Sequence, residues 1–266
     1  NYARKMRLPV VRLLDGASGG GSVKMALENG FHYVPLNPGW DAVVDNLSLA
    51  PVVSAAVGPT VGLGAARLAM SHLAVMVRGI GQAFTAGPPV VKGSTGEDLN
   101  TDSGVVERMV DSEQEAFEVI RAFLSYLPRN VDELPPRQEC DDSVDRREDY
   151  LLKAIPRNSR KPYDIGAILE SIFDQGSVFI YAEYGGSTVT ALARLNGYPV
   201  GVLATNPLKG VTMSVEGAQA ATRLVDLCET FHLPLVSLTD QGGVSIGSAA
   251  ERRGTIRHGV RAIAAI

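Results

Sequence analysis

The residues best suited to chemistry lie in a glycine-rich segment, residues 58–64, that follows a strand predicted at residues 51–57. The segment differs from the dinucleotide-binding fingerprint, because Arg67 stands where that pattern has its third glycine. A helix is predicted to begin within it. The N–H groups of Gly62 and Leu63 near that start, aided by the helix dipole, predict a turn that binds an oxyanion. The alternative is tight packing of the helix on the strand.

A second glycine-rich segment contains a candidate nucleophile. Residues 16–20 read Gly-Ala-Ser-Gly-Gly, which matches the G-x-S-x-G pattern after a predicted strand and makes Ser18 a hydrolase candidate. That pattern needs a helix directly after the serine, whereas the first helix predicted downstream covers residues 40–47. The histidines do not form a catalytic set by spacing, and His72 and His232 are expected to have structural roles. The Ser18 hydrolase remains an alternative function.

The composition excludes several classes of protein. Lys plus Arg number 25 against 29 for Asp plus Glu, and the basic residues are scattered, so no nucleic-acid partner is expected. No apolar run reaches the roughly 18 residues of a membrane span. Cys140 and Cys228 are too few for a disulfide framework or a zinc site, and Cys228 is predicted to be a buried thiol in a reducing compartment. We expect no metal.

The elements that must position these segments form a repeating pattern. The sequence Leu-Pro-Val-Val-Arg-Leu-Leu-Asp at residues 8–15 resembles Leu-Pro-Leu-Val-Ser-Leu-Thr-Asp at residues 233–240, and each is followed by a glycine-rich stretch. Before the second copy we predict a hairpin over residues 188–205 that turns at Asn196-Gly197, then a helix over residues 214–232. The predicted unit is strand, strand, helix, strand.

The charged middle of the chain predicts two domains. A capping box at Ser112 opens a helix that Pro128 ends, and Asp164 caps another helix. Between them the composition turns to Pro, Asp, Glu and Arg. We therefore predict a domain at residues 1–127, a linker at residues 128–163 and a second domain at residues 164–266. The chain starts without Met and ends in a predicted helix cut mid-turn, so we expect a central fragment of a longer protein.

The order of the motifs along the whole chain carries a family resemblance. In the second half they are Asn196-Gly197, residues 201–207 (Gly-Val-Leu-Ala-Thr-Asn-Pro), residues 226–231, Leu233-Pro234, Thr239-Asp240, Glu251, Gly254 and residues 256–259 (Ile-Arg-His-Gly). Upstream of these motifs they are residues 51–62, residues 87–92, residues 95–97, residues 103–105 and residues 161–164. Because these motifs occur in this order, the chain resembles the carboxyltransferase (beta) subunits of biotin-dependent acyl-CoA carboxylases, which belong to the crotonase superfamily.

The resemblance implies an α/β fold with two crotonase-like domains of repeated strand-strand-helix units, both truncated in this fragment. It implies transfer of a carboxyl group from carboxybiotin, held on a separate carrier protein, to the α-carbon of an acyl-CoA. Backbone N–H groups would stabilise the enolate, and no side-chain base would be needed. The family's second oxyanion loop would lie beyond residue 266, so we expect this fragment alone to be inactive.

The resemblance also places site residues. The oxyanion pair falls on Gly62 and Leu63, where family members usually show Gly-Gly, so the Leu63 side chain narrows the approach to a thioester. Further substrate contacts are expected from two glycine loops and nearby positions, namely Gly19, Gly20, Lys24, Gly58, Gly242 and Gly243.

The resemblance also implies partners, which are a biotin carboxylase or biotin carrier subunit and further copies of the chain, as a dimer or a trimer of dimers. The implied compartment is intracellular, either cytoplasm or mitochondrial matrix. A homologue that binds acyl-CoA or a partner without catalysis is the other alternative.

Overall fold

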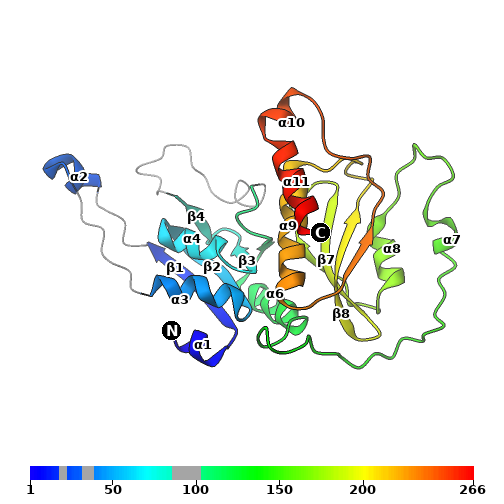
Figure 1. Cartoon of the computed structure of the whole chain (residues 1–266), viewed down its shortest axis with the longest axis horizontal. Helices are drawn as coiled ribbons and strands as arrows, with labels where there is room; N and C mark the ends of the chain where they lie inside the picture. Colours follow the sequence, from blue (N-terminus) through cyan, green and yellow to red (C-terminus); the bar gives the residue numbers. More distant parts are fainter. Residues whose placement is uncertain (18–22, 32–38, 86–102) are drawn as a thin grey trace. The chain divides into compact units, whose positions relative to one another are not determined.

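A computed structural model describes residues 1–17, 23–31, 39–85 and 103–266 of the chain. Over these ranges the chain divides into two compact units, Asn1–Arg121 and Ala122–Ile266. The division falls inside helix α6 (Glu113–Ser125), near the middle of the colour scale in Figure 1.

The first unit is built on a parallel sheet. Within the described residues its strands have the order β1-β2-β3-β5, and β4 pairs with β2. All of these pairings are parallel. Every residue of β3 is buried, which is typical of parallel strands covered on both faces. The strands are β1 (Val10–Ala17), β2 (Val52–Val61), β3 (Leu73–Val77), β4 (Gln82–Phe84) and β5 (Arg108–Val110).

The helices of the first unit are short. They are α1 (Tyr2–Met6), α2 (Val23–Asn29), α3 (Trp40–Asp45) with the 3₁₀ turn η1 (Asn46–Ser48), and α4 (Leu63–Ala69). The predicted helix at residues 40–47 is confirmed as α3 and η1. α2 is not predicted by the sequence pattern. The strand predicted to end at Val57 extends to Val61, because Pro59, Thr60 and Val61 pair with the residues of β4.

His72 joins two parts of the first unit. Its Nδ1 accepts a hydrogen bond from the N–H of Val52 at 2.9 Å, and its Nε2 lies 3.0 Å from the carbonyl oxygen of Leu47. Because both ring nitrogens are engaged with main-chain groups, the structural role predicted for this histidine is confirmed.

The second unit contains a mixed sheet with the order β6-β7-β8-β9. Its strands are β6 (Phe179–Ala182), β7 (Thr188–Leu195), β8 (Tyr198–Thr205) and β9 (Leu235–Leu238). β7 and β8 form the predicted hairpin, and Asn196 and Gly197 have φ of 51° and 78°, as a type I′ turn requires. α9 (Val215–Thr230) then leads to β9, which lies parallel to β8. The predicted strand, strand, helix, strand unit is confirmed.

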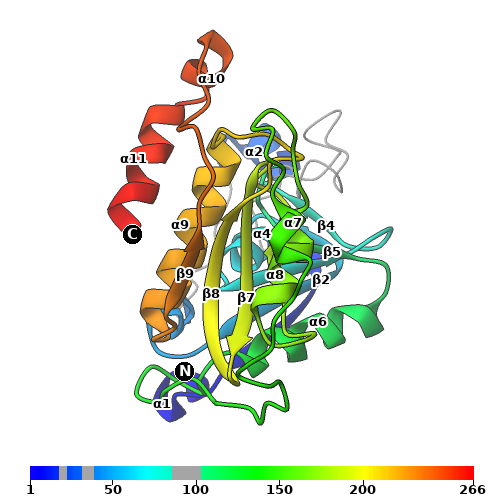
Figure 2. The ribbon, with the colours of Figure 1, turned by 90° about the vertical axis from the view of Figure 1, so that its right-hand side faces the viewer.

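Side-chain caps set the two main helices of this unit. At the start of α8 (Ile165–Ile172), the Asp164 carboxylate accepts a hydrogen bond from the N–H of Gly166 at 2.9 Å. At the start of α9, the Ser214 hydroxyl accepts a hydrogen bond from the N–H of Gly217 at 3.1 Å. α8 and α9 lie on opposite faces of the sheet (Figure 2). The remaining helices are α7 (Leu151–Ala154), α10 (Ser248–Arg252) and α11 (Thr255–Ala265). None of the helices in the described residues combines the length and hydropathy needed to cross a bilayer.

The segment predicted as a linker, residues 128–163, belongs to the second unit. The N–H of Gln138 donates to the carbonyl of Gly197 at 3.1 Å, and the buried guanidinium of Arg194 donates to the carbonyl of Pro136 at 3.1 Å. These bonds attach the segment to the turn of the β7–β8 hairpin. Its polar composition reflects an exposed segment that is hydrogen-bonded to the second unit, and the division of the chain lies upstream of it.

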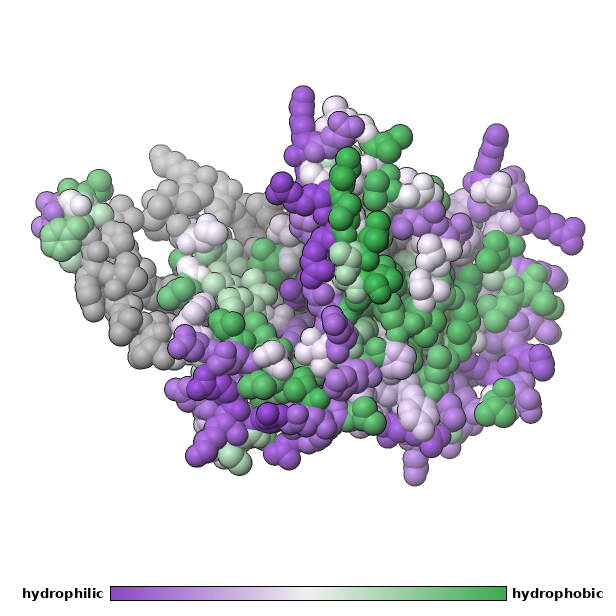
Figure 3. All heavy atoms as spheres, viewed as in Figure 1, coloured by the Kyte–Doolittle hydropathy of each residue, from purple (hydrophilic) through white to green (hydrophobic). Residues whose placement is uncertain are grey.

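The outer face of α11 is apolar. Gly259 and Ala262 are buried, and α11 packs against α9, whereas Ile256, Val260 and Ile263 are exposed. These side chains form part of the hydrophobic column over α11 in Figure 3. Spacing of apolar residues by three and four places them on one face of the helix. Within the second unit this face is left uncovered.

Gly201 provides the close contact between β8 and α9. A Cβ atom added there would lie 2.2 Å from Sγ of Cys228. We predict that Gly201→Ala destabilises the second unit by about 1–3 kcal/mol, because the core cannot absorb the added methyl group without moving the helix. Equilibrium denaturation measures the change. In a Cys228→Ala background the same substitution should cost clearly less, and an equal cost in both backgrounds would contradict this packing.

Cys228 is predicted to be chemically inert in the folded protein. Burial raises the pKa of its thiol to about 12, and the thiolate is the reactive species. In a Cys140→Ser variant, a disulfide reagent at pH 8 should label the folded protein at least about 100-fold more slowly than the unfolded protein. Rapid labelling without unfolding would show that the thiol is accessible.

Candidate functional site

The carboxyl edge of the parallel sheet in the first unit is the site that the sequence analysis singled out. β1 ends at Ala17, β2 at Val61 and β4 at Phe84, all at this edge because the strands are parallel. α4 begins there, directly after β2. Ligands of open parallel sheets bind outside the carboxyl ends of the strands, so the geometry agrees with a binding role.

Gly62 makes the turn from β2 into α4. Its φ of 59° and ψ of −117° correspond to the first central position of a type II′ turn, where glycine is preferred. Its carbonyl accepts from the N–H of Ala66 at 2.9 Å, so it also acts as the N-cap. Its own N–H donates to the carbonyl of Phe84 at 2.9 Å. The prediction that the Gly62 amide receives an oxyanion is therefore wrong for this structure, because the pairing of β4 with β2 uses that donor.

The first turn of α4 supplies other donors. The initial N–H groups of a helix have no acceptor within the helix. No acceptor for the N–H of Gly64 or of Ala65 occurs among the residues that the structure describes. Beside them the Leu63 side chain is 40% exposed. Sequence reasoning missed Gly64, although its position one residue into the helix was the available signal. The donor role of Leu63 stays a prediction.

The other end of α4 is held by Arg12 from β1. Its guanidinium Nη1 donates to the carbonyls of Arg67 and Met70, each at 3.0 Å. Burial, together with the charge of Arg67, lowers the pKa of Arg12. A cation at the carbonyl end of a helix complements the helix dipole. Arg12 thereby fixes the helix whose opposite end presents the N–H groups.

Gly58 lies on the same edge but has a packing role. The register between β1 and β2 shifts between Leu14 and Gly16, and a Cβ atom added to Gly58 would lie 2.1 Å from Oδ1 of Asp15. The Asp15 side chain therefore occupies the space over Gly58 that a substrate contact was expected to use.

The remaining predicted contacts of the first unit are only partly described. Gly19, Gly20 and the candidate nucleophile Ser18 lie outside the described residues. Lys24 on α2 is exposed, and its ammonium lies 3.8 Å from the Glu28 carboxylate on the same helix. Such an exposed pair adds little stability and leaves the lysine available to a stronger anion.

The glycine segment of the second unit, residues 241–243, follows β9. The N–H of Gly242 donates to the carbonyl of Val211 at 2.7 Å, and the carbonyl of Gly243 accepts from the N–H of Met213 at 2.9 Å. Both glycines are exposed, and Gly243 has a φ of 108°. A contact through the Gly242 amide is therefore excluded in this conformation, whereas the exposed backbone of Gly243 agrees with a binding role.

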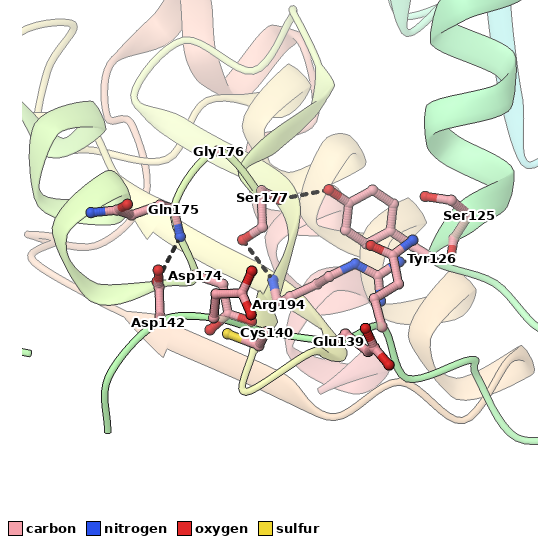
Figure 4. A pocket seen from close by; sticks show the side chains of 12 residues that line it. Ser125, Tyr126, Glu139, Cys140, Asp142, Asp174, Gln175, Gly176, Ser177 and Arg194 are labelled. Carbon is pink, nitrogen blue, oxygen red and sulfur yellow. Dashed lines mark hydrogen bonds between the residues drawn. The ribbon is translucent and has the colours of Figure 1, made fainter. Parts of the chain in front are cut away.

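A polar pocket of about 360 Å³ lies elsewhere in the second unit (Figure 4). Ligand atoms of Cys140, Asp142 and Asp174 lie within 4.8 Å of one another in its wall. Asp174 accepts from the N–H groups of Asn196 and Gly197, at 2.9 and 2.7 Å. Sequence reasoning missed this cluster, because its members come from distant parts of the chain.

The cluster has a structural explanation. Asp142 accepts from the N–H of Gln175 at 2.9 Å and pairs with Arg146 at 3.0 Å. A hydrogen bond with the Asp142 backbone lowers the pKa of the Cys140 thiol, but partial burial and the carboxylates of Asp174 and Asp142 raise it overall. The Asp142 carboxylate thus holds Gln175 and Arg146, and the Asp174 carboxylate holds the hairpin turn.

The sequence matches a known family. Residues 44–266 match the family described as carboxyl transferase domain. A propionyl-CoA carboxylase carboxyltransferase subunit of Haloferax mediterranei is 34% identical over an alignment of 226 positions that covers 80% of this chain and 44% of the relative. The methylmalonyl-CoA decarboxylase subunit alpha of Veillonella parvula is 28% identical over an alignment of 275 positions that covers 97% of this chain and 52% of the relative.

The fold agrees with a solved structure of the transcarboxylase 12S hexamer, in which hydrolysed methylmalonyl-coenzyme A is bound. The two superpose with a TM-score of 0.84 at 26% identity, over 99% of this chain and 52% of that one. The chain thus spans about half the length of the relatives it matches. With most of its residues inside the matched region, the chain belongs to the carboxyl transferase domain family.

Proposed function

We propose that the full-length protein transfers a carboxyl group from carboxybiotin, held on a separate carrier protein, to the α-carbon of an acyl-CoA. Family membership supports this reaction class. The observation that carries the proposal is the N–H of Gly64, which has no acceptor among the described residues and lies at the start of α4, on the carboxyl edge of a parallel sheet.

The chemistry needs a donor of this kind. When the α-proton of a thioester leaves, negative charge develops on the thioester oxygen. A fixed main-chain N–H stabilises that charge without reorganisation, and loss of one such donor typically slows a reaction about 100- to 1,000-fold. Carboxybiotin supplies the carboxyl group and, once it has released that group, a nitrogen base. This chain's part is to hold the thioester oxygen and to keep the acyl group oriented.

Other features of the proposal concern substrate and partners. We propose that Lys24, with Gly19 and Gly20 before it, binds the phosphates of coenzyme A, since its ammonium is exposed and its one described partner is the exposed Glu28 carboxylate. The two units are proposed to be parts of two crotonase-like domains, which the strand, strand, helix, strand unit of the second supports. A biotin carrier subunit and further copies of the chain are the proposed partners, in an intracellular compartment.

The direct test is a transfer assay. The full-length protein is mixed with a carboxybiotin-bearing carrier and acetyl-, propionyl- or butyryl-CoA, and the products are analysed by mass spectrometry. We expect the acyl-CoA to gain one carboxyl group as the carrier loses it. Binding of acyl-CoA without any transfer would instead favour a homologue that has lost catalysis.

The donor role of Gly64 is tested by a matched pair of variants. Gly64→Pro removes the N–H at a position in the first helical turn, and we expect transfer to fall about 100-fold or more. Gly64→Ala keeps the N–H, and its Cβ would lie 3.5 Å from the nearest atom, the carbonyl oxygen of Gly16, which is ordinary contact. We expect near-normal transfer from Gly64→Ala. Circular dichroism and thermal unfolding check that both variants fold, and equal activity of the two would refute the donor role.

A further inference from the structure

A hydrogen bond in the second unit joins residues 77 positions apart. The hydroxyl of Tyr163 donates to the Asp240 carboxylate at 2.9 Å. Tyr163 directly precedes Asp164, the N-cap of α8, while Asp240 lies just after β9. The bond therefore connects the start of a helix on one face of the sheet with the carboxyl end of a strand.

Asp240 also has a main-chain attachment. Its N–H donates to the hydroxyl of Thr205, the last residue of β8, at 3.2 Å. Asp240 is thereby held from two sides, through its side chain and through its backbone. Because residue 241 follows at once, these two bonds determine the direction in which the glycine segment 241–243 leaves the sheet.

The far end of the glycine segment is attached to a neighbouring loop. The N–H of Gly242 donates to the carbonyl of Val211 at 2.7 Å. The N–H of Met213 donates to the carbonyl of Gly243 at 2.9 Å, and the N–H of Ser245 donates to the carbonyl of Met213 at 2.8 Å. The segment is thus a short exposed arch with fixed ends. These three bonds join main-chain groups, whereas the bond from the Tyr163 hydroxyl can be removed by substituting one side chain.

The tyrosine is a stable donor. Burial first, and then the hydrogen bond and negative charge of Asp240, raise the pKa of Tyr163 to about 12. The hydroxyl therefore keeps its proton throughout the neutral range. A hydrogen bond from a hydroxyl to a carboxylate is charge-assisted and stronger than a neutral one.

We propose that Tyr163 is a positioning residue that, through Asp240, sets the conformation in which the glycine segment 241–243 meets a substrate. This inference rests on the proposed function and on the substrate contact expected from that segment, for which the backbone of Gly243 is exposed. It adds a residue just before α8 that acts through Asp240 and does not touch the substrate.

The test compares Tyr163→Phe with Tyr198→Phe. Tyr198 is 53% exposed in the same unit and contacts Arg137 through its ring, so its variant controls for loss of a tyrosine hydroxyl. In the full-length protein, Tyr163→Phe should raise one KM, either that for acyl-CoA or that for the carboxybiotin carrier, about 3- to 10-fold. The other KM and kcat should stay within about twofold of the wild-type values. A general loss of structure would change both KM values and the melting temperature.

A second measurement does not depend on activity. Hydrogen exchange of peptides that cover residues 240–245 should become about 3- to 10-fold faster in Tyr163→Phe and stay unchanged in Tyr198→Phe. Asp240→Asn retains an oxygen that can accept from the hydroxyl and should have a smaller effect than Asp240→Ala. Unchanged exchange in Tyr163→Phe would overturn the inference, even if carboxyl transfer itself is observed. Absence of transfer by the wild type, with exchange altered as expected, would overturn only the proposed function and the substrate contact expected from the glycine segment.

Discussion

The hydrogen bond from the N–H of Gly62 to the carbonyl of Phe84 determines where β2 ends and α4 begins. It extends the pairing of β2 with β4 by one step, and the positive φ of Gly62 then reverses the chain into the helix. A residue with a side chain would be strained in this conformation, by about 1–3 kcal/mol. Everything at the carboxyl edge follows from this turn, because it decides which amides are used inside the sheet and which ones face outward.

Local signals were sufficient to predict most elements of the second unit. The Asn196-Gly197 turn, the cap at Asp164 and the apolar face of α9 all act over a few residues, and each was placed correctly. The extension of β2 and the attachment of residues 128–163 depend instead on partners far away in sequence. Polar composition is the same for a linker between two domains and for an exposed segment that is hydrogen-bonded to a hairpin, so it could not distinguish them.

The candidate site shows the same limit. Its location at a turn between strand and helix could be predicted from the glycine spacing. The identity of the available donor could not, because it depends on β4, which pairs beside β2 only in the folded unit. Gly58 was expected to contact substrate, yet Asp15 occupies that space after a register shift that no local pattern encodes. The bond between Tyr163 and Asp240 likewise joins two predicted elements whose mutual contact only the tertiary structure reveals.

The two sheets also differ in how far apart their paired strands lie along the chain. β7 and β8 are joined by a two-residue turn, and hairpins of this kind form within about 1–10 μs. β1 pairs with β2 only after the chain between them, including α2 and α3, has been brought back, and such closure has an entropic cost that slows folding. The second unit thus contains a local hairpin from which folding can start, whereas the parallel sheet of the unit that contains Gly64 depends on pairing between strands that are distant along the chain.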